Sequence, residues 1–316
     1  MYFPISIESG RWAGVPLTTA AADRSGMVVA IFGPTASGKT AVAEAVADRL
    51  GTEVVSADAM QVYHGLPLLT NQPARATRLV AIWPLAHGAS VGEYQRLAQA
   101  AIDDLLATRR AAVVAGGTGL YLRAALADLD MPPAPDPETR ARWLAEYDRD
   151  RDHTYAELTS RDPPAAAAVH VNDRRRVVRA LELTDVGASL VPEADRLWSA
   201  HTRHPTLIVG LEVPADELER RIALRTAAMF EAGVVDEVEV AVAQPLSQTA
   251  EKALGLREIA SLPPAEAHER VLVRTRQYAA YQRKWMRRIP GLVRVDACRP
   301  ANEVAGEILE MARARQ

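Results

Sequence analysis

A glycine-rich segment, residues 33–40, constrains the fold of this chain more than any other part of its sequence. It reads Gly-Pro-Thr-Ala-Ser-Gly-Lys-Thr and fits the pattern G-x-x-x-x-G-K-[ST]. Residues 27–32 before it are apolar and rich in β-branched types, which predicts a buried strand, and residues 41–47 after it predict a helix. A strand, a glycine-rich turn and a helix in this order form the context in which the pattern binds phosphate. We therefore predict an α/β fold with a phosphate or diphosphate site near its amino end.

Within this segment each residue type has a chemical reason to be present. Gly33 and Gly38 permit backbone geometry that turns N–H groups toward an anion, and the helix that follows adds its partial positive charge. Lys39 would pair with phosphate oxygens, and the Thr40 hydroxyl would bind Mg²⁺. The predicted diphosphate-binding loop comprises Gly33, Pro34, Thr35, Ala36, Ser37, Gly38, Lys39 and Thr40.

Composition sets the limits on what this loop serves. The chain has 316 residues and a formal net charge of −3, so contacts with nucleic acid require local basic patches. A single cysteine, Cys298, excludes an internal disulfide and a cysteine-rich zinc site. No apolar run approaches the roughly twenty residues that span a bilayer. We expect a monomer in the reducing cytoplasm, with no membrane association.

Strands and helices alternate along most of the chain, which predicts a parallel sheet flanked by helices. Further strands are expected at 52–56, 111–115, 206–211 and 292–295, and long helices at 91–109, 216–242 with a break near Gly233, and 264–288. A proline-rich stretch, 132–137, precedes a charged segment that is helical in pattern and poor in strand formers. We therefore divide the chain into an N-terminal disordered tail (1–26), an α/β core (27–130 and 205–316) and a helical insertion (131–204).

Three predicted strands end in residues that can do chemistry, and such ends meet at one edge of a parallel sheet. One end carries the phosphate loop, the second Asp58 and the third Thr118 within Gly116-Gly117-Thr118-Gly119. Asp58 can serve as a base and hydrogen-bond acceptor or as a ligand of Mg²⁺, and either residue can instead cap a helix. No apolar strand ends in the acidic residue with which nucleotide hydrolases hold Mg²⁺, which argues against a motor or switch ATPase.

Two arginine-rich clusters provide local positive charge. One is Arg174-Arg175-Arg176 with Arg179, and the other follows the predicted helix at 264–288, where Tyr278, Tyr281 and Trp285 are interleaved. Arginine with aromatic residues at helical spacing suits phosphate contact and base stacking, although a solvated charged face has the same pattern.

Taken together, these motifs resemble the tRNA dimethylallyltransferase family over residues 27–296. The resemblance rests on the phosphate loop, on Ser-Ala-Asp-Ala-Met-Gln at 56–61, on Gly-Gly-Thr-Gly-Leu-Tyr at 116–121, on His-Val-Asn-Asp at 170–173 and on Thr-Arg-Gln-Tyr at 275–278. It implies a P-loop NTPase-like core that binds dimethylallyl diphosphate with Mg²⁺. The prenyl group would move to N6 of adenosine 37 in tRNA, whose anticodon stem-loop the core and the insertion would clasp.

The resemblance also implies roles for individual residues. Asp58 would orient and deprotonate the adenine amine, Thr118 would touch both reactants, and Lys39 and Arg276 would bind the diphosphate. The implied tRNA-contacting residues are Asp58, Ala59, Met60, Gln61, Thr118, Arg140, Arg175, Arg176, Arg179, Lys252, Arg257, Gln282, Arg283, Lys284 and Arg287. The chain departs from the family pattern at 69–73, within 78–81, at Leu256 and at 280–285, and these changes touch the acceptor side.

Three other functions remain open from the sequence. The first keeps the prenyl transfer but uses a free adenine nucleotide as acceptor, as in cytokinin-forming relatives. The insertion with Arg140 and Arg175 disfavours it, because a small acceptor needs no clasp. The second is a small-molecule kinase with Asp58 holding the acceptor hydroxyl. The third is a non-catalytic RNA-binding remnant, which the presence of both Lys39 and Asp58 disfavours.

Overall fold

The sheet at the centre of the protein is parallel throughout. The computed structural model describes residues 26–133, 136–191 and 196–315, so the expected tail lies outside the described residues except for Gly26. The described strands run in the order β2-β3-β1-β4-β5, and every neighbouring pair is parallel, which confirms the predicted α/β sheet. The strands are β1 (Met27–Phe32), β2 (Val54–Ser56), β3 (Ala111–Gly116), β4 (Thr206–Glu212) and β5 (Val293–Asp296).

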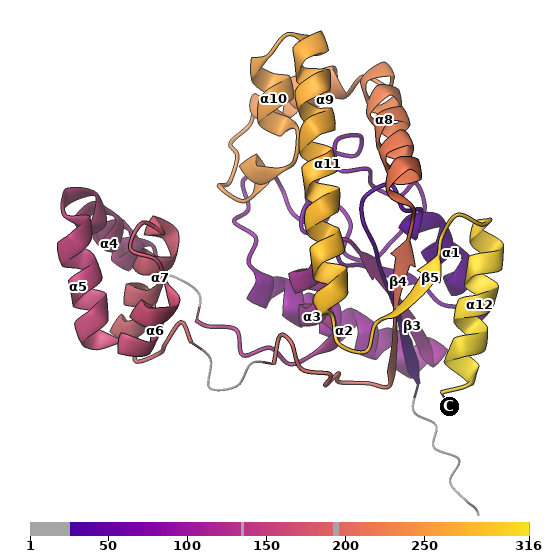
Figure 1. The fold of residues 1–316 in the computed structure, drawn as a ribbon, viewed down its shortest axis with the longest axis horizontal. Helices are drawn as coiled ribbons and strands as arrows, with labels where there is room; N and C mark the ends of the chain where they lie inside the picture. Colours follow the sequence, from indigo (N-terminus) through magenta and orange to yellow (C-terminus); the bar gives the residue numbers. More distant parts are fainter. Residues whose placement is uncertain (1–25, 134–135, 192–195, 316) are drawn as a thin grey trace, which may run out of the picture.

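Helices cover both faces of this sheet (Figure 1). Alternate residues of a strand point to opposite faces, so Val28, Ala30 and Phe32 belong to one hydrophobic core and Val29 and Ile31 to the other. The first core is closed by α2 (Val91–Arg109), α3 (Gly119–Leu126) and α11 (Pro264–Arg288), and the second by α1 (Lys39–Leu50), α8 (Ala215–Glu231) and α12 (Ala301–Arg313). Among the described residues, no helix combines the length and apolarity needed to cross a membrane.

The predicted break in the helical stretch 216–242 falls at Gly233, which separates α8 from α9 (Val234–Val242). Gly233 has φ of 93°, a left-handed conformation that glycine adopts without the strain of a side chain. Two short helices, η1 (Ala250–Lys252) and α10 (Leu256–Ser261), connect α9 to α11. These elements stand together at the end of α11 that lies away from the strands (Figure 1).

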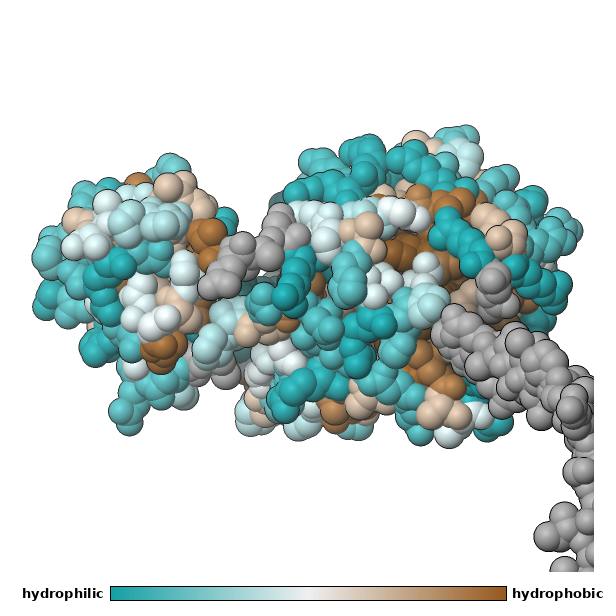
Figure 2. Space-filling view, turned by 90° about the horizontal axis from the view of Figure 1, so that it is seen from below, coloured by the Kyte–Doolittle hydropathy of each residue, from teal (hydrophilic) through white to brown (hydrophobic). Residues whose placement is uncertain are grey.

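The segment between β3 and β4 contains a separate helical lobe. Its helices are α4 (Pro137–Arg149), α5 (Arg151–Arg161), α6 (Pro163–Ala168) and α7 (Arg174–Asp185). They bury a hydrophobic core of their own, in which Leu158 and Leu181 are fully enclosed. Figures 1 and 2 both show this lobe beside the α/β core rather than on top of the sheet.

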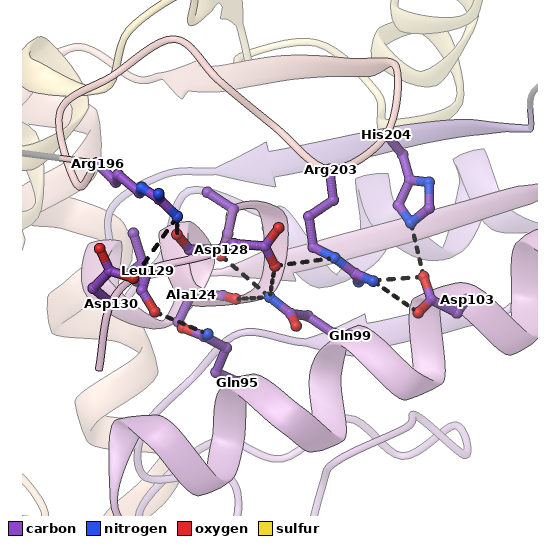
Figure 3. Close-up of polar contacts among 11 residues, drawn as sticks. Gln95, Gln99, Asp103, Ala124, Asp128, Leu129, Asp130, Arg196, Arg203 and His204 are labelled. Carbon is purple, nitrogen blue, oxygen red and sulfur yellow. Dashed lines mark hydrogen bonds and ion pairs between the residues drawn. The ribbon is translucent and has the colours of Figure 1, made fainter. Parts of the chain in front are cut away.

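The chain leaves the core and returns to it at neighbouring points on α2 (Figure 3). On the outgoing side, the Gln99 amide lies 3.4 Å from Oδ1 of Asp128, and on the returning side Arg203 and His204 both bind Asp103, with the His204 Nε2 at 2.7 Å. Arg203 also contacts Asp128 at 3.2 Å, so one guanidinium joins both passages of the chain. The two passages are thereby fixed to one helix and to each other.

A buried arginine strengthens the returning passage. Arg123 of α3 has no exposed surface and donates to four carbonyl oxygens, those of Arg196, Leu197, Ser199 and His201. Burial lowers the pKa of this guanidinium, whose ordinary value is so high that it stays charged. Peptide carbonyls, each with a partial negative charge, therefore balance a buried cation and fix the path of the chain into β4.

Candidate active site

The phosphate loop joins β1 to α1 and is shaped to receive an anion. Gly38 has φ of 86° and stands at the N-cap of α1 without a capping side chain, so the first N–H groups of the helix are left for a ligand. The Ser37 hydroxyl is buried inside the loop and has no hydrogen-bond partner among the described residues. Gly33 is necessary here, because a Cβ would lie 2.8 Å from that hydroxyl. The unpartnered Ser37 hydroxyl and the uncapped N–H groups at the start of α1 together suit the oxygen atoms of an anion.

Lys39 closes the loop on itself. Its ammonium donates to the carbonyl oxygen of Pro34 at 2.8 Å. Burial lowers the Lys39 pKa to about 8, the negative charge of Asp58 acts against this, and the positive charge of Arg225 adds to it. The site therefore holds two cations that lack sufficient negative charge, and an incoming diphosphate would supply it.

Asp58 lies two residues beyond β2, in a turn that faces the phosphate loop. Its Oδ1 accepts a hydrogen bond of 2.9 Å from the backbone N–H of Met60, which fixes the carboxylate. The next residue, Ala59, donates its N–H to the Thr118 hydroxyl at 3.3 Å. The structure thus brings together Lys39, Asp58 and Thr118, the three predicted catalytic residues.

Thr118 stands at the N-cap of α3, but its side chain makes no capping hydrogen bond. Its hydroxyl instead contacts the Ala59 N–H and, at 3.5 Å, the hydroxyl of Tyr278. The capping alternative raised by the sequence therefore does not describe this residue. A hydroxyl exposed to the site and held from two sides can orient a reactant.

The glycines around Thr118 allow neighbouring segments to approach closely. A Cβ at Gly116 would lie 2.1 Å from the carbonyl oxygen of Ala57, so the glycine is needed where β3 meets the turn that carries Asp58. A Cβ at Gly117 would lie 2.1 Å from the Gln282 amide nitrogen, and one at Gly119 would lie 2.1 Å from the Trp285 ring. The loop around Thr118 is therefore in close contact with both α11 and the turn that carries Asp58.

Gln282 is the predicted RNA-contacting residue whose position differs most from expectation. Its side chain is 2% exposed. Its Oε1 accepts from the backbone N–H of Thr35 at 2.7 Å, and its Nε2 donates to the carbonyl oxygen of Gly117 at 2.8 Å. The structure thus turns Gln282 into the protein, between the phosphate loop and the Thr118 loop, and away from the surface.

Sequence reasoning missed Arg225 on α8. Burial lowers the Arg225 pKa, and the negative charge of Asp58 acts against this shift. The positive charge of Arg225 also lowers the Lys39 pKa. Lys39, Asp58 and Arg225 therefore lie close enough for their charges to interact. No motif marks this residue. The available signal is the buried stripe of α8 at Leu218, Ile222 and Thr226, next to which Arg225 lies on the helix surface.

Arg276, the arginine that the sequence assigns to the diphosphate, is engaged elsewhere. Its guanidinium forms an ion pair of 2.7 Å with Glu219 of α8, and its side chain is 43% exposed. No hydrogen bond joins it to the loop residues that the structure describes. Arg225 is therefore the better candidate for a second cation beside Lys39.

Three tyrosines lie close enough to Asp58 for its charge to act on them. Burial, and next to it nearby charge, raises the pKa of Tyr94, Tyr121 and Tyr278 above the ordinary value. Tyr94 donates to the carbonyl oxygen of Ser56 at 2.8 Å. Its ring packs against that of Tyr121, with 4.2 Å between the centroids and the planes tilted by 34°. All three remain neutral near pH 7.

The arginines of the insertion divide into structural and available ones. Arg140 and Arg179 both bind Glu182, at 2.6 and 2.9 Å, and the Glu182 side chain is almost fully buried. Arg175 and Arg176 are exposed in the first turn of α7, where the helix end repels positive charge. Two such cations without an ion pair among the described residues suit an anionic partner.

Among the predicted contacts on the core, Lys252, Arg257, Lys284 and Arg287 are exposed, and Lys252 lies toward the insertion. Burial lowers the Lys252 pKa, and the positive charges of Arg175 and Arg140 lower it further, so cations of the core and the insertion converge. Arg257 forms an ion pair of 3.0 Å with Glu251. On α11, Lys284 and Arg287 are exposed and Arg283 is half-buried. The aromatic pair Trp198 and Trp285 lies beside them, and Arg288 stacks on Trp198.

The described residues contain no group of three or more histidine, cysteine or acidic side chains that could hold a metal. Thr40 stands exposed in the first turn of α1, next to the phosphate loop. Mg²⁺ commonly takes most of its ligands from phosphate oxygens and water. A Thr40 hydroxyl and a bound diphosphate therefore fit Mg²⁺, whereas an all-protein site does not.

Comparisons with known proteins identify relatives of the whole chain. A family model described as IPP transferase matches residues 61–289, and one described as isopentenyl transferase matches residues 26–78. Curated tRNA dimethylallyltransferases of Salinispora arenicola and Thermobifida fusca are 38% and 39% identical to the chain. These alignments cover 86% and 83% of this chain and 83% and 88% of the two relatives.

Two solved structures share the fold. The full-length tRNA isopentenylpyrophosphate transferase from Bacillus halodurans superposes with a TM-score of 0.66 at 27% identity, over 92% of this chain and 96% of that one. A eukaryotic dimethylallyltransferase acting on tRNA superposes with a TM-score of 0.71 over 86% of this chain and 74% of that one. Its 24% identity establishes likeness of fold alone.

Proposed function

The chain belongs to the IPP transferase family, and from that premise we propose that it transfers a dimethylallyl group from dimethylallyl diphosphate to N6 of adenosine 37 in tRNA. The observation that carries the proposal is the Ala59–Thr118 hydrogen bond of 3.3 Å. It joins the turn that carries Asp58 to the Thr118 loop, beside the phosphate loop. A donor leaving group and an acceptor amine can therefore meet at one point.

On the donor side, the phosphate loop and two cations receive the diphosphate. The leaving group gains negative charge as its bond to carbon breaks. The N–H groups at the start of α1, the Ser37 hydroxyl, Lys39 and Arg225 would stabilise that charge. Lys39 would exchange its contact with Pro34 for phosphate oxygens. Mg²⁺ held by Thr40 and the diphosphate would supply further positive charge there.

On the acceptor side, Asp58 is fixed by Met60 and accepts a hydrogen bond from the adenine amine. The N6 lone pair attacks the allylic carbon, a C–N bond forms, and the C–O bond to the diphosphate breaks. The amine proton then passes to the Asp58 carboxylate. An exocyclic amine is a poor nucleophile, so its alignment by Asp58 and Thr118 matters as much as proton removal.

The base must leave the RNA stack to reach this position, and the cations outside the site would hold the surrounding backbone. Arg175 and Arg176 of the insertion and Lys252 of the core converge on one space, and Lys284 and Arg287 continue the positive charge along α11. This arrangement supports an RNA acceptor over a free nucleotide, because a small acceptor has no use for cations so far from Asp58. We place the enzyme in the cytoplasm as a monomer.

A labelled-donor assay tests the proposal. The purified protein is incubated with Mg²⁺ and radiolabelled dimethylallyl diphosphate, and with tRNA that lacks the modification, the same tRNA with guanosine at position 37, or AMP. We expect label in the first tRNA alone. Label in AMP would show that the acceptor is a free nucleotide. Label in the tRNA with guanosine at position 37 would show that the acceptor is another base of the tRNA.

A further inference from the structure

We infer that Gln282 is a positioning residue that sets the separation between the phosphate loop and the Thr118 loop (residues 116–119). The inference rests on the proposed function for its meaning, since the two loops would bind the two reactants. It assigns to Gln282 a role different from the RNA contact that the family resemblance implies.

The geometry of one amide group carries the inference. Thr35 N–H lies 2.7 Å from Oε1 of Gln282 and can only donate, and the Gly117 carbonyl lies 2.8 Å from Nε2 and can only accept. The orientation of the Gln282 amide is therefore fixed by its two partners. Residues 35 and 117 are far apart in the chain, and this single planar group joins them.

The surrounding residues of α11 hold the same loop. Tyr278, one helical turn before Gln282, contacts the Thr118 hydroxyl at 3.5 Å, and Trp285, nearly one turn after it, packs on Gly119. Residues at these spacings share one face of a helix. Tyr278, Gln282 and Trp285 thus contact residues 118, 117 and 119, respectively. Gln282 also contacts Thr35 of the phosphate loop.

Burial separates this role from RNA binding. Gln282 is 2% exposed, whereas Lys284 and Arg287 on the same helix are exposed. Because the Thr35 N–H is occupied by Gln282, it does not contribute to the anion site, and its contact fixes the loop's shape instead. A shift of about 1 Å between reacting groups can lower a rate by about 100-fold. Loss of this bridge should therefore act on the transfer step.

Substitution Gln282→Glu tests this through pH. A neutral carboxylic acid can accept from Thr35 and donate to Gly117, as the amide does, whereas the ionised form places a carboxylate against the Gly117 carbonyl. Burial raises the pKa of a carboxyl group, so the neutral form is within reach of ordinary buffers. We expect the ratio of variant to wild-type single-turnover rates at saturating tRNA to rise by about tenfold from about pH 8.5 to about pH 6.

A matched variant and a binding measurement define the outcomes. Gln277→Glu makes the same chemical change at an exposed position of α11, and its rate ratio should not change with pH. The tRNA Kd of Gln282→Glu should stay within about twofold of wild type. A raised Kd with an unchanged saturated rate would make Gln282 an RNA contact, and a ratio independent of pH would also overturn the inference.

A measurement without turnover keeps the inference separate from the proposed function. Amide hydrogen exchange of the peptide containing Thr35 should be slow in wild type and at least about tenfold faster in Gln282→Leu, with unchanged exchange in α12 as the folding control. Equal exchange would refute the bridge whether or not the protein transfers a prenyl group. Absence of transfer by the wild type with slow Thr35 exchange would refute the proposed function alone.

Discussion

The Lys39 ammonium donates a hydrogen bond of 2.8 Å to the carbonyl oxygen of Pro34, five residues earlier in the same loop. This hydrogen bond holds the Lys39 ammonium within the phosphate loop. Because burial lowers the Lys39 pKa to about 8, its charge is not constant over the usual range of assay pH. Donor binding should therefore depend on pH.

The direction of this pH dependence follows from the protonation state of Lys39 that binds the diphosphate. A diphosphate prefers charged Lys39, so it raises the Lys39 pKa on binding, and affinity is highest below about pH 8. Above that pH we expect the affinity for a non-reacting dimethylallyl diphosphate analogue to fall, at most about tenfold per pH unit. Calorimetric titration between about pH 7 and about pH 10 measures this. Lys39→Arg keeps its charge throughout, and the same slope in that variant would contradict the assignment.

Asp58→Asn should separate donor binding from transfer. The asparagine carbonyl can still accept from the Met60 N–H, so the turn keeps its shape, but the group can no longer take a proton. We expect kcat to fall by about 100- to 10,000-fold while the donor Kd changes little. Rapid-quench kinetics measures the transfer rate and calorimetry measures the donor Kd on the same preparation. A donor Kd that rises as steeply as kcat falls would place Asp58 on the donor side.

Arg225 and Arg276 offer a direct comparison of two arginines. Arg225→Lys keeps the charge but loses the planar guanidinium near the phosphate loop, and we expect the KM for the diphosphate to rise by about tenfold or more. Arg276→Lys, at the ion pair with Glu219, should leave this KM within about twofold. Steady-state kinetics at saturating tRNA decides between them, and the reverse order of effects would return Arg276 to the diphosphate site.

Arg175→Ala should weaken RNA binding through loss of one phosphate contact. We expect the tRNA Kd to rise and the slope of log Kd against log salt to decrease by about one, with kcat at saturating tRNA unchanged. Arg313→Ala removes the same charge from exposed α12 and serves as the control. Filter binding at several salt concentrations provides the slopes, and identical slopes for both variants would exclude a phosphate contact at Arg175.

Arg140→Ala should instead reduce stability. Its partner Glu182 is buried and would keep Arg179 alone, so part of the carboxylate would lose its hydrogen bonds at a cost of about 1–3 kcal/mol. We expect a lower Tm, and partial recovery in the double variant Arg140→Ala/Glu182→Gln, which removes the buried charge. Calorimetric melting tests this. An unchanged Tm with weaker tRNA binding would show that Arg140 acts on RNA directly.

The sequence was sufficient for the fold because the decisive signals are local. The strand before residue 33, the glycines and Lys39 lie within one short segment. The next two strands lead to Asp58 and to the glycine-rich residues 116–119. The break at Gly233 was likewise visible, since a glycine inside a helical pattern marks a left-handed residue. These features need no knowledge of distant contacts.

The remaining features depend on which way a helix faces. Arg225 differs from its neighbouring arginines only in its orientation on α8, and Gln282 occurs among exposed charged residues although its own side chain is buried. Arg140 and Glu182 are 42 positions apart, so their pairing depends on how α4 packs on α7. Such relationships arise from tertiary packing and leave no short motif.

The chain contacts α2 on both sides of the insertion. Gln99 of α2 contacts Asp128 on the outgoing side, and Asp103 of α2 binds Arg203 on the returning side, which has a consequence for how this architecture can vary. The outgoing and returning segments are held side by side by these contacts. The sheet therefore does not depend on the length or content of the segment between them. Lengthening, trimming or exchanging that lobe would leave the strand order and the phosphate cradle intact. The helical lobe, and with it the proposed contacts with RNA, can therefore change during evolution while the proposed catalytic residues keep their positions.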